Sequence, residues 1–164
     1  MKHKMVGKIV FFATLLPSLA VVAQAQGDSI CSSARLAGAW GYTYTGALIL
    51  PTGAVPAGSV GRFTVDAAGN LSGTQTSSVG GSVGEDMIAG TVAVNSDCTG
   101  TATVRIYSPS GTLLRTAVLA LVFVDNAREF RAIFQSLALA NGTNVPAVIT
   151  MDGKKLIPGR GNEQ

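Results

Sequence analysis

Eight strand-sized runs, each followed by a turn-forming segment, make up residues 39–157. The runs are rich in Val, Ile, Thr, Ala and aromatic residues, and the connecting segments are rich in Gly, Asn, Asp, Pro and Ser. Asn141-Gly142 is one such connection, and it favours a tight turn because Gly and Asn accept a positive φ. The predicted strands span residues 39–50, 59–66, 71–78, 82–94, 101–108, 112–124, 129–139 and 145–157.

This pattern predicts an all-β fold built as an antiparallel meander. The spacing of an amphipathic helix is confined to one short turn at residues 32–36. Strands of about 8–13 residues with tight turns favour a closed eight-stranded up-and-down barrel, because closure removes exposed edges. A β-sandwich is the alternative. A membrane-spanning barrel is less favoured, because aromatic residues make up only 6% of the chain, too few for two girdles.

The first 25 residues have the layout of a secretory signal peptide. A basic segment, residues 1–8, precedes an apolar stretch, residues 9–22, and Ala23-Gln24-Ala25 supplies the small-x-small cleavage pattern. We expect cleavage after Ala25 and a secreted or periplasmic protein, with an uncleaved membrane anchor as the alternative. The mature chain would then comprise an N-terminal segment (26–38), a barrel domain (39–157) and a tail (158–164).

The net charge of +3 belongs to this leader. Lys2, Lys4 and Lys8 lie in it, together with the only histidine, His3, and the remainder carries nine Lys and Arg against nine Asp and Glu. A balanced chain without a basic run is not expected to bind nucleic acid. We also expect no stable membrane insertion after cleavage, and the oligomeric state stays open.

The two cysteines, Cys31 and Cys98, predict one disulfide in an oxidising compartment. It would close a loop of about 67 residues and stabilise the fold by roughly 3–4 kcal/mol on the chain-entropy model. Two free buried thiols are the alternative. No metal site is expected, because two thiols are too few ligands and no histidine remains in the mature chain.

Several catalytic chemistries are excluded for the mature chain. Ser-His-Asp and Cys-His mechanisms need a histidine. Gly80-Gly81-Ser82-Val83-Gly84 matches a nucleophile elbow as a string, but it lies in a predicted hairpin rather than before a helix. Residues 95–100 match the first half of a calcium loop, but Ile106 stands where a bidentate Glu is required, so a turn is the better interpretation. No cofactor is expected.

Polar and aromatic residues within the strands are the remaining candidates for a ligand site. Trp40, Tyr42 and Tyr44 share one face of the first strand by alternation, and Glu129, Arg131 and Gln135 share a face of the seventh. The full set of candidate ligand-binding residues is Trp40, Tyr42, Tyr44, Arg62, Glu85, Arg105, Tyr107, Arg115, Glu129, Arg131 and Gln135. Arg side chains pointing inward would orient a carboxylate or carbonyl. The competing interpretation places the charges on a solvated outer face and the aromatics in a core.

Gly38-Ala39-Trp40 at the entry to the first strand resembles the Gly-x-Trp signature of lipocalins and related calycins. In those proteins the Trp closes one end of the barrel beneath a basic residue of the last strand, which implies Lys154 or Lys155 here. The strand count is also similar to that of allene-oxide-cyclase-like barrels. Residues 61–76 and 90–104 resemble segments of secreted bacterial proteins.

Three functional hypotheses follow. The first is a secreted barrel that binds a small, mostly apolar ligand in its interior. The second is a cofactor-independent cyclase or isomerase, and the third is a structural or adhesion module with a filled core. A hollow interior would favour the first two over the third, and a buried carboxylate among interior Tyr and Arg would favour the enzyme over the binder.

Overall fold

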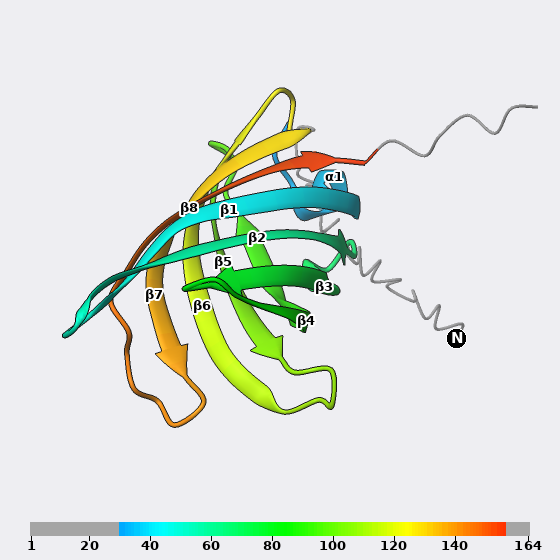
Figure 1. The fold of residues 1–164 in the computed structure, drawn as a ribbon. Coiled ribbons are helices and arrows are strands. Elements are labelled where there is room, and N and C mark those ends of the chain that lie inside the picture. Colours follow the sequence, from blue (N-terminus) through cyan, green and yellow to red (C-terminus); the bar gives the residue numbers. More distant parts are fainter. Residues whose placement is uncertain (1–29, 157–164) are drawn as a thin grey trace, which may run out of the picture.

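The computed structural model describes residues 30–156. The predicted signal peptide and the predicted tail 158–164 lie outside this range. Eight strands form a closed barrel in which each strand pairs antiparallel with its neighbours in sequence and the last pairs with the first (Figure 1). The strands are β1 (Gly38–Leu50), β2 (Gly53–Val65), β3 (Asn70–Val79), β4 (Ser82–Val94), β5 (Thr99–Tyr107), β6 (Leu113–Val124), β7 (Glu129–Leu139) and β8 (Ala147–Lys155). The closed barrel is confirmed, and the β-sandwich alternative is wrong.

Strand β2 departs most from its predicted bounds, because it begins at Gly53 rather than at residue 59. Its first residues pair with β1 alone, up to Pro56 opposite Ala47, and its pairing with β3 begins only at Ala57. Pro56 therefore lies where the ladder has no partner on its β3 side, and the missing N–H is tolerated there. Its carbonyl still accepts a 2.8 Å hydrogen bond from the amide of Gly80.

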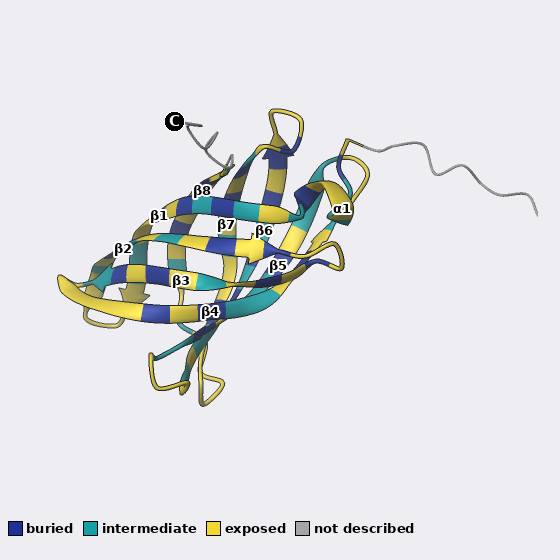
Figure 2. Ribbon diagram, turned by 90° about the vertical axis from the view of Figure 1, so that its right-hand side faces the viewer, coloured by how far each residue is buried: buried dark blue, intermediate teal, exposed yellow. Residues whose placement is uncertain are grey.

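The side chains alternate between the barrel interior and the outer surface, as the bands of buried and exposed residues along the strands show (Figure 2). A bulge in β7 shifts this alternation. Consecutive residues of β6 pair with Phe134 and Ser136, so Gln135 is the extra residue. Phe130 faces inward before the bulge, and Leu137 faces inward after it.

A short helix, α1 (Ser33–Leu36), covers one end of the barrel, where the sequence predicted a helical turn. The Ser32 side chain caps it by accepting from the amide of Arg35. Leu36 and Trp40 are the largest side chains with almost no exposure, and the Trp40 indole N–H donates to the Leu36 carbonyl at 2.9 Å. This hydrogen bond fixes the helix against the start of β1.

Lys155 of β8 completes this closed end. Its ammonium lies 5.8 Å from the centre of the Trp40 ring and donates to the Arg35 carbonyl at 2.6 Å. Burial lowers the pKa of Lys155. The basic residue expected over the tryptophan is therefore Lys155, whereas Lys154 points outward and pairs with Glu129 at 2.7 Å.

The disulfide between Cys31 and Cys98 is present, which confirms the predicted pairing and overturns the alternative of two free thiols. It joins the segment before α1 to the turn between β4 and β5. Asp97 shapes that turn by accepting from the amide and the hydroxyl of Thr99 at 3.0 and 2.7 Å. This segment thus forms a turn held by its own side chains, as predicted, and continues into β5 at Thr99.

Candidate ligand-binding cavity

The barrel encloses a cavity of about 220 Å³. Its wall runs from Leu36 of α1 and from Trp40 to Leu48, Leu139 and Val145 at the opposite end. The wall is almost entirely aliphatic and aromatic. A dry cavity of about 150 Å³ lined by Leu, Ile and Phe is large enough to take up benzene. The interior of this barrel therefore has room for a molecule larger than a single benzene ring.

Aromatic rings fill the barrel beneath α1 and form the floor of the cavity. Trp40 stacks on Phe63 with ring centres 6.3 Å apart, and it contacts the rings of Phe123 and Phe130 at 6.4 and 5.7 Å. Such ring pairs add stability beyond the area that they bury. These rings are packed against one another and bound the cavity at this end.

A set of polar side chains, contributed by β1 to β4 and by β6, interrupts the apolar lining of the interior. Seven inward-facing residues form this interior polar cluster: Tyr42, Tyr44, Ser59, Gln75, Ser77, Asp86 and Arg115. Tyr42, Tyr44, Gln75 and Arg115 reach the cavity surface. The other three residues face the interior but do not line the cavity.

Asp86 is the centre of the cluster. Its Oδ2 accepts three hydrogen bonds, from Gln75 Nε2 at 2.8 Å, Ser77 Oγ at 2.9 Å and Arg115 Nη2 at 2.9 Å. The carboxylate is buried, with 7% of its side chain exposed, whereas Arg115 is 22% exposed. Because the guanidinium carries the opposite charge, the buried pair is neutral as a unit.

The two tyrosines extend the cluster towards the ligand space. The Tyr42 hydroxyl donates to Gln75 Oε1 at 2.7 Å, and the Tyr44 hydroxyl lies beside Arg115. Burial raises the pKa of Tyr42 far above its ordinary value, and the neighbouring Tyr44 adds to the rise. Burial also raises the pKa of Tyr44, against a smaller opposing effect of the Arg115 charge. Both phenols are therefore neutral hydrogen-bond donors at physiological pH.

Ser59 lies beside the two tyrosines, and its hydroxyl partly offsets the rise in their pKa values. It lies between Tyr44 and Ser77 in the register of the sheet. Its buried Oγ lies close to the Tyr42 and Tyr44 hydroxyls but makes no well-aligned hydrogen bond within residues 30–156. An unpaired buried hydroxyl costs about 1–3 kcal/mol, so most such groups in proteins have partners.

The structure separates the sequence-predicted site residues into two groups. Trp40, Tyr42, Tyr44 and Arg115 line the cavity and lie together. The others do not line it: Arg62, Glu85, Arg105, Tyr107, Glu129, Arg131 and Gln135. Arg62, Glu85, Arg105, Arg131 and Gln135 are exposed, and Tyr107 and Glu129 are half-buried.

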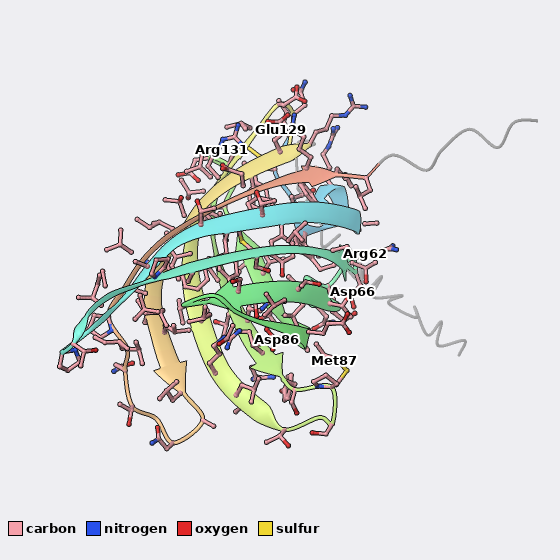
Figure 3. The ribbon with its side chains drawn as sticks, viewed as in Figure 1. Arg62, Asp66, Asp86, Met87, Glu129 and Arg131 are labelled. Carbon is pink, nitrogen blue, oxygen red and sulfur yellow. A yellow bond between two sulfur atoms is a disulfide. The ribbon has the colours of Figure 1, made fainter. Side chains whose placement is uncertain are left out.

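Glu129 and Arg131 belong to a charge network on the outer face. Arg131 lies 3.5 Å from Glu129 and 3.2 Å from Asp152, and Lys154 also contacts Glu129. Figure 3 shows both labelled side chains on the outside of the barrel, away from Asp86. The structure therefore places them outside the cavity, because alternation in β7 gives the inward positions to Phe130 and Ala132.

Sequence reading missed Asp86, Gln75 and Ser77. A signal for Asp86 was available, because the period-2 pattern of β4 places it on the same face as Ile88 and Val92, which are both buried. Gln75 and Ser77 likewise share a face of β3 with the buried Leu71. A polar residue that shares a strand face with buried apolar residues is therefore a candidate for a hydrogen-bond network inside the barrel.

Two further strings of the sequence are resolved by the fold. Gly80 and Gly81 form the turn between β3 and β4, both with positive φ, so the Gly-x-Ser-x-Gly string belongs to a hairpin as predicted.

Within residues 30–156, no three Cys, His, Asp or Glu side chains lie close enough to hold a metal ion. No helix in the same range is long and apolar enough to cross a membrane.

Comparison of the sequence with protein-family models and with curated proteins found no match.

Proposed function

We propose that the protein binds a small, mostly apolar molecule inside the barrel. The observation that carries this proposal is the apolar cavity of about 220 Å³ whose polar lining groups Tyr42, Tyr44, Gln75 and Arg115 belong to one connected cluster. Concave, mainly apolar sites with a few placed polar groups are typical of small-molecule binding. The apolar wall supplies affinity, and the polar cluster supplies orientation.

A filled structural module is the weaker hypothesis, because such a core would be closed by side chains. Native interiors are packed almost without voids larger than a water molecule. Here Ala102 and Ala117 occupy inward positions of β5 and β6 that larger side chains could fill. Small residues at these positions keep the space open, which supports a binding role.

Export is part of the proposal. The disulfide is typical of proteins that fold in an oxidising compartment, and the first 25 residues have the layout of a signal peptide. We infer a secreted or periplasmic binding protein. Mass spectrometry of the exported protein should find Gln26 as its first residue, and a chain that retains Met1 would contradict the cleavage.

A displacement experiment tests binding. The purified protein is mixed with N-phenyl-1-naphthylamine, an uncharged dye that fluoresces in apolar surroundings, and small apolar molecules are then added. We expect dye fluorescence that saturates at one dye per protein and falls as competitors enter. No dye binding, together with no retained small molecule in native mass spectrometry, would overturn the proposal.

A cofactor-independent isomerase or cyclase is the second candidate. It is favoured by one observation, the buried carboxylate of Asp86 among Tyr42 and Arg115. Asp86 is not part of the cavity wall, and its bonded oxygen already has three donors. A simple base is therefore a poor role for it. NMR spectra of a bound ligand that stay unchanged during incubation would favour the binder, and new product resonances that require Tyr44 would favour the enzyme.

A further inference from the structure

The charge of the cavity wall is the starting point for identifying the class of ligand. Within residues 30–156, Arg115 is the one charged residue that lines the cavity. Its Nη2 already donates to Oδ2 of Asp86 at 2.9 Å, and Asp86 itself does not line the cavity. The pair has no net charge, so a ligand meets donor groups in surroundings that are electrically neutral.

A carboxylate ligand would disturb this balance. Beside an intact Asp86–Arg115 pair, it would leave one uncompensated negative charge in an apolar interior, which costs several kcal/mol. If it drew Arg115 away, Asp86 would be the uncompensated charge instead. Gln75 and Ser77 would still donate to Asp86, but both are neutral and do not replace a cation.

An uncharged oxygen meets no such penalty. A guanidinium has five N–H donors, and the bond to Asp86 involves Nη2 only. The Tyr44 hydroxyl lies beside Arg115, and its raised pKa keeps its proton in place. A carbonyl oxygen has two lone pairs, so one such oxygen can accept from Arg115 and Tyr44 together.

We propose that the ligand is an uncharged molecule in which an apolar chain or ring carries a carbonyl group, as in a ketone or an ester. Its carbonyl oxygen accepts hydrogen bonds from Arg115 and Tyr44, and its apolar part lies between this point and the aromatic floor. The cavity discriminates against the corresponding carboxylate. This inference rests on the proposed function, because it specifies the occupant of the same cavity.

Two isomers provide the test. Methyl heptanoate and octanoic acid have the same atoms, but at neutral pH the first is an uncharged ester and the second is a carboxylate. Binding to the purified protein can be followed through Trp40, which is the only tryptophan of the chain and lies in the cavity wall. We expect the ester to bind at least about tenfold more tightly, a difference of about 1.4 kcal/mol.

Asp86→Asn changes the charge of the cluster while keeping the shape of the side chain. Arg115 then carries an unbalanced positive charge, and the preference should shift by at least about tenfold towards octanoate. Glu85→Gln is the matched control. It removes the same charge from the adjacent residue, which is exposed on the outer face, and should leave the preference unchanged.

The outcomes separate this inference from the proposed function. Octanoate binding as tightly as the ester to the unaltered protein overturns the inference and leaves an apolar binding site in place. The inference is also overturned, with the apolar binding site left in place, if folded Asp86→Asn binds octanoate no more tightly, relative to the ester, than the unaltered protein does. Weaker binding of methyl heptanoate by Tyr44→Phe, with the circular dichroism spectrum retained, supports the role of Tyr44 as a donor to the carbonyl oxygen, and unchanged ester affinity counts against that role. Failure of both isomers and of the dye to bind counts against the proposed function itself.

Discussion

Asp86 and Arg115 meet inside the barrel at 2.9 Å although they belong to β4 and β6, which are separated by β5. Asp86 also bonds to Gln75 and Ser77 of β3, the neighbouring strand on its other side. One carboxylate thus connects strands on both sides of β4. The pair holds side chains of three strands in place and leaves the interior without net charge.

Removing Arg115 alone should be strongly destabilising. Arg115→Gln leaves Asp86 buried without its cation, and we expect a loss of about 3–5 kcal/mol in the free energy of unfolding. The double variant Asp86→Asn, Arg115→Gln should recover most of this loss, because no charge is then left unpaired. Urea unfolding of the two single variants and the double variant measures the coupling.

Arg131→Gln is the control for that cycle. Arg131 pairs with Glu129 and Asp152 on the outer face, where 55% of its side chain is exposed. Solvent screens such pairs, so the expected loss is below about 1 kcal/mol. A loss as large as that of Arg115→Gln would contradict the assignment of the interior pair as the important one.

Reduction of the disulfide should loosen the closed end of the barrel. Replacing Cys31 and Cys98 together by Ser should lower the free energy of unfolding by about 3–4 kcal/mol, because the loop of 67 residues is no longer closed in the unfolded chain. Urea unfolding with and without a reductant checks this prediction. Reductant should destabilise the natural protein and have no effect on the Ser variant.

Alkaline pH should destabilise the fold through the two interior tyrosines. Their pKa values are raised in the folded state, so the unfolded chain loses its phenolic protons first as the pH rises above about 10. The contribution of the two tyrosines to the free energy of unfolding is therefore fully present below about pH 10. Above this pH the free energy of unfolding falls by up to about 1.4 kcal/mol per pH unit for each tyrosine.

Urea unfolding across this alkaline range measures the slope. Tyr44→Phe should make the fall with pH shallower, after each variant is normalised to its own stability at neutral pH. An unchanged slope would mean that Tyr44 ionises in the folded protein as readily as in the unfolded chain.

Replacing Gly153 in β8 by a residue with a side chain should destabilise the fold. A Cβ atom at this position would overlap the ring of Phe130, one of the aromatic side chains of the cavity floor. Gly153→Ala should cost about 1–3 kcal/mol, the typical range for overpacking. Gly84→Ala is the matched control, because Gly84 also lies in a strand but has no neighbouring atom within 4 Å of the added group. It should be neutral or stabilising by up to about 1 kcal/mol.

The architecture could be read from the sequence because strand runs and turn residues are local signals. Strand β7 was predicted with the bounds that the structure shows, and β2 was not, because the role of Pro56 depends on where the pairing with β3 begins. That starting point is a property of the register between strands. No pattern within β2 itself encodes it.

The candidate site was only partly predictable for a related reason. Alternation identified Trp40, Tyr42 and Tyr44, since they occur on one face of a single strand. In β4 the prediction selected Glu85, although the adjacent Asp86 is the residue that shares a face with the apolar Ile88 and Val92. The partners of Asp86 come from β3 and β6, and this convergence exists only after the barrel closes.

The account depends on the interior of the barrel being a usable binding space, and calorimetric titration of an uncharged ketone measures this. We expect 2-nonanone to bind one molecule per protein, with the negative heat-capacity change that accompanies burial of apolar surface. Ala117→Leu, which places a larger side chain in the cavity wall, should weaken binding at least about tenfold, whereas Ala120→Leu on the outer face of β6 should not. Equal binding by both variants, or no binding by the unaltered protein, would contradict the account.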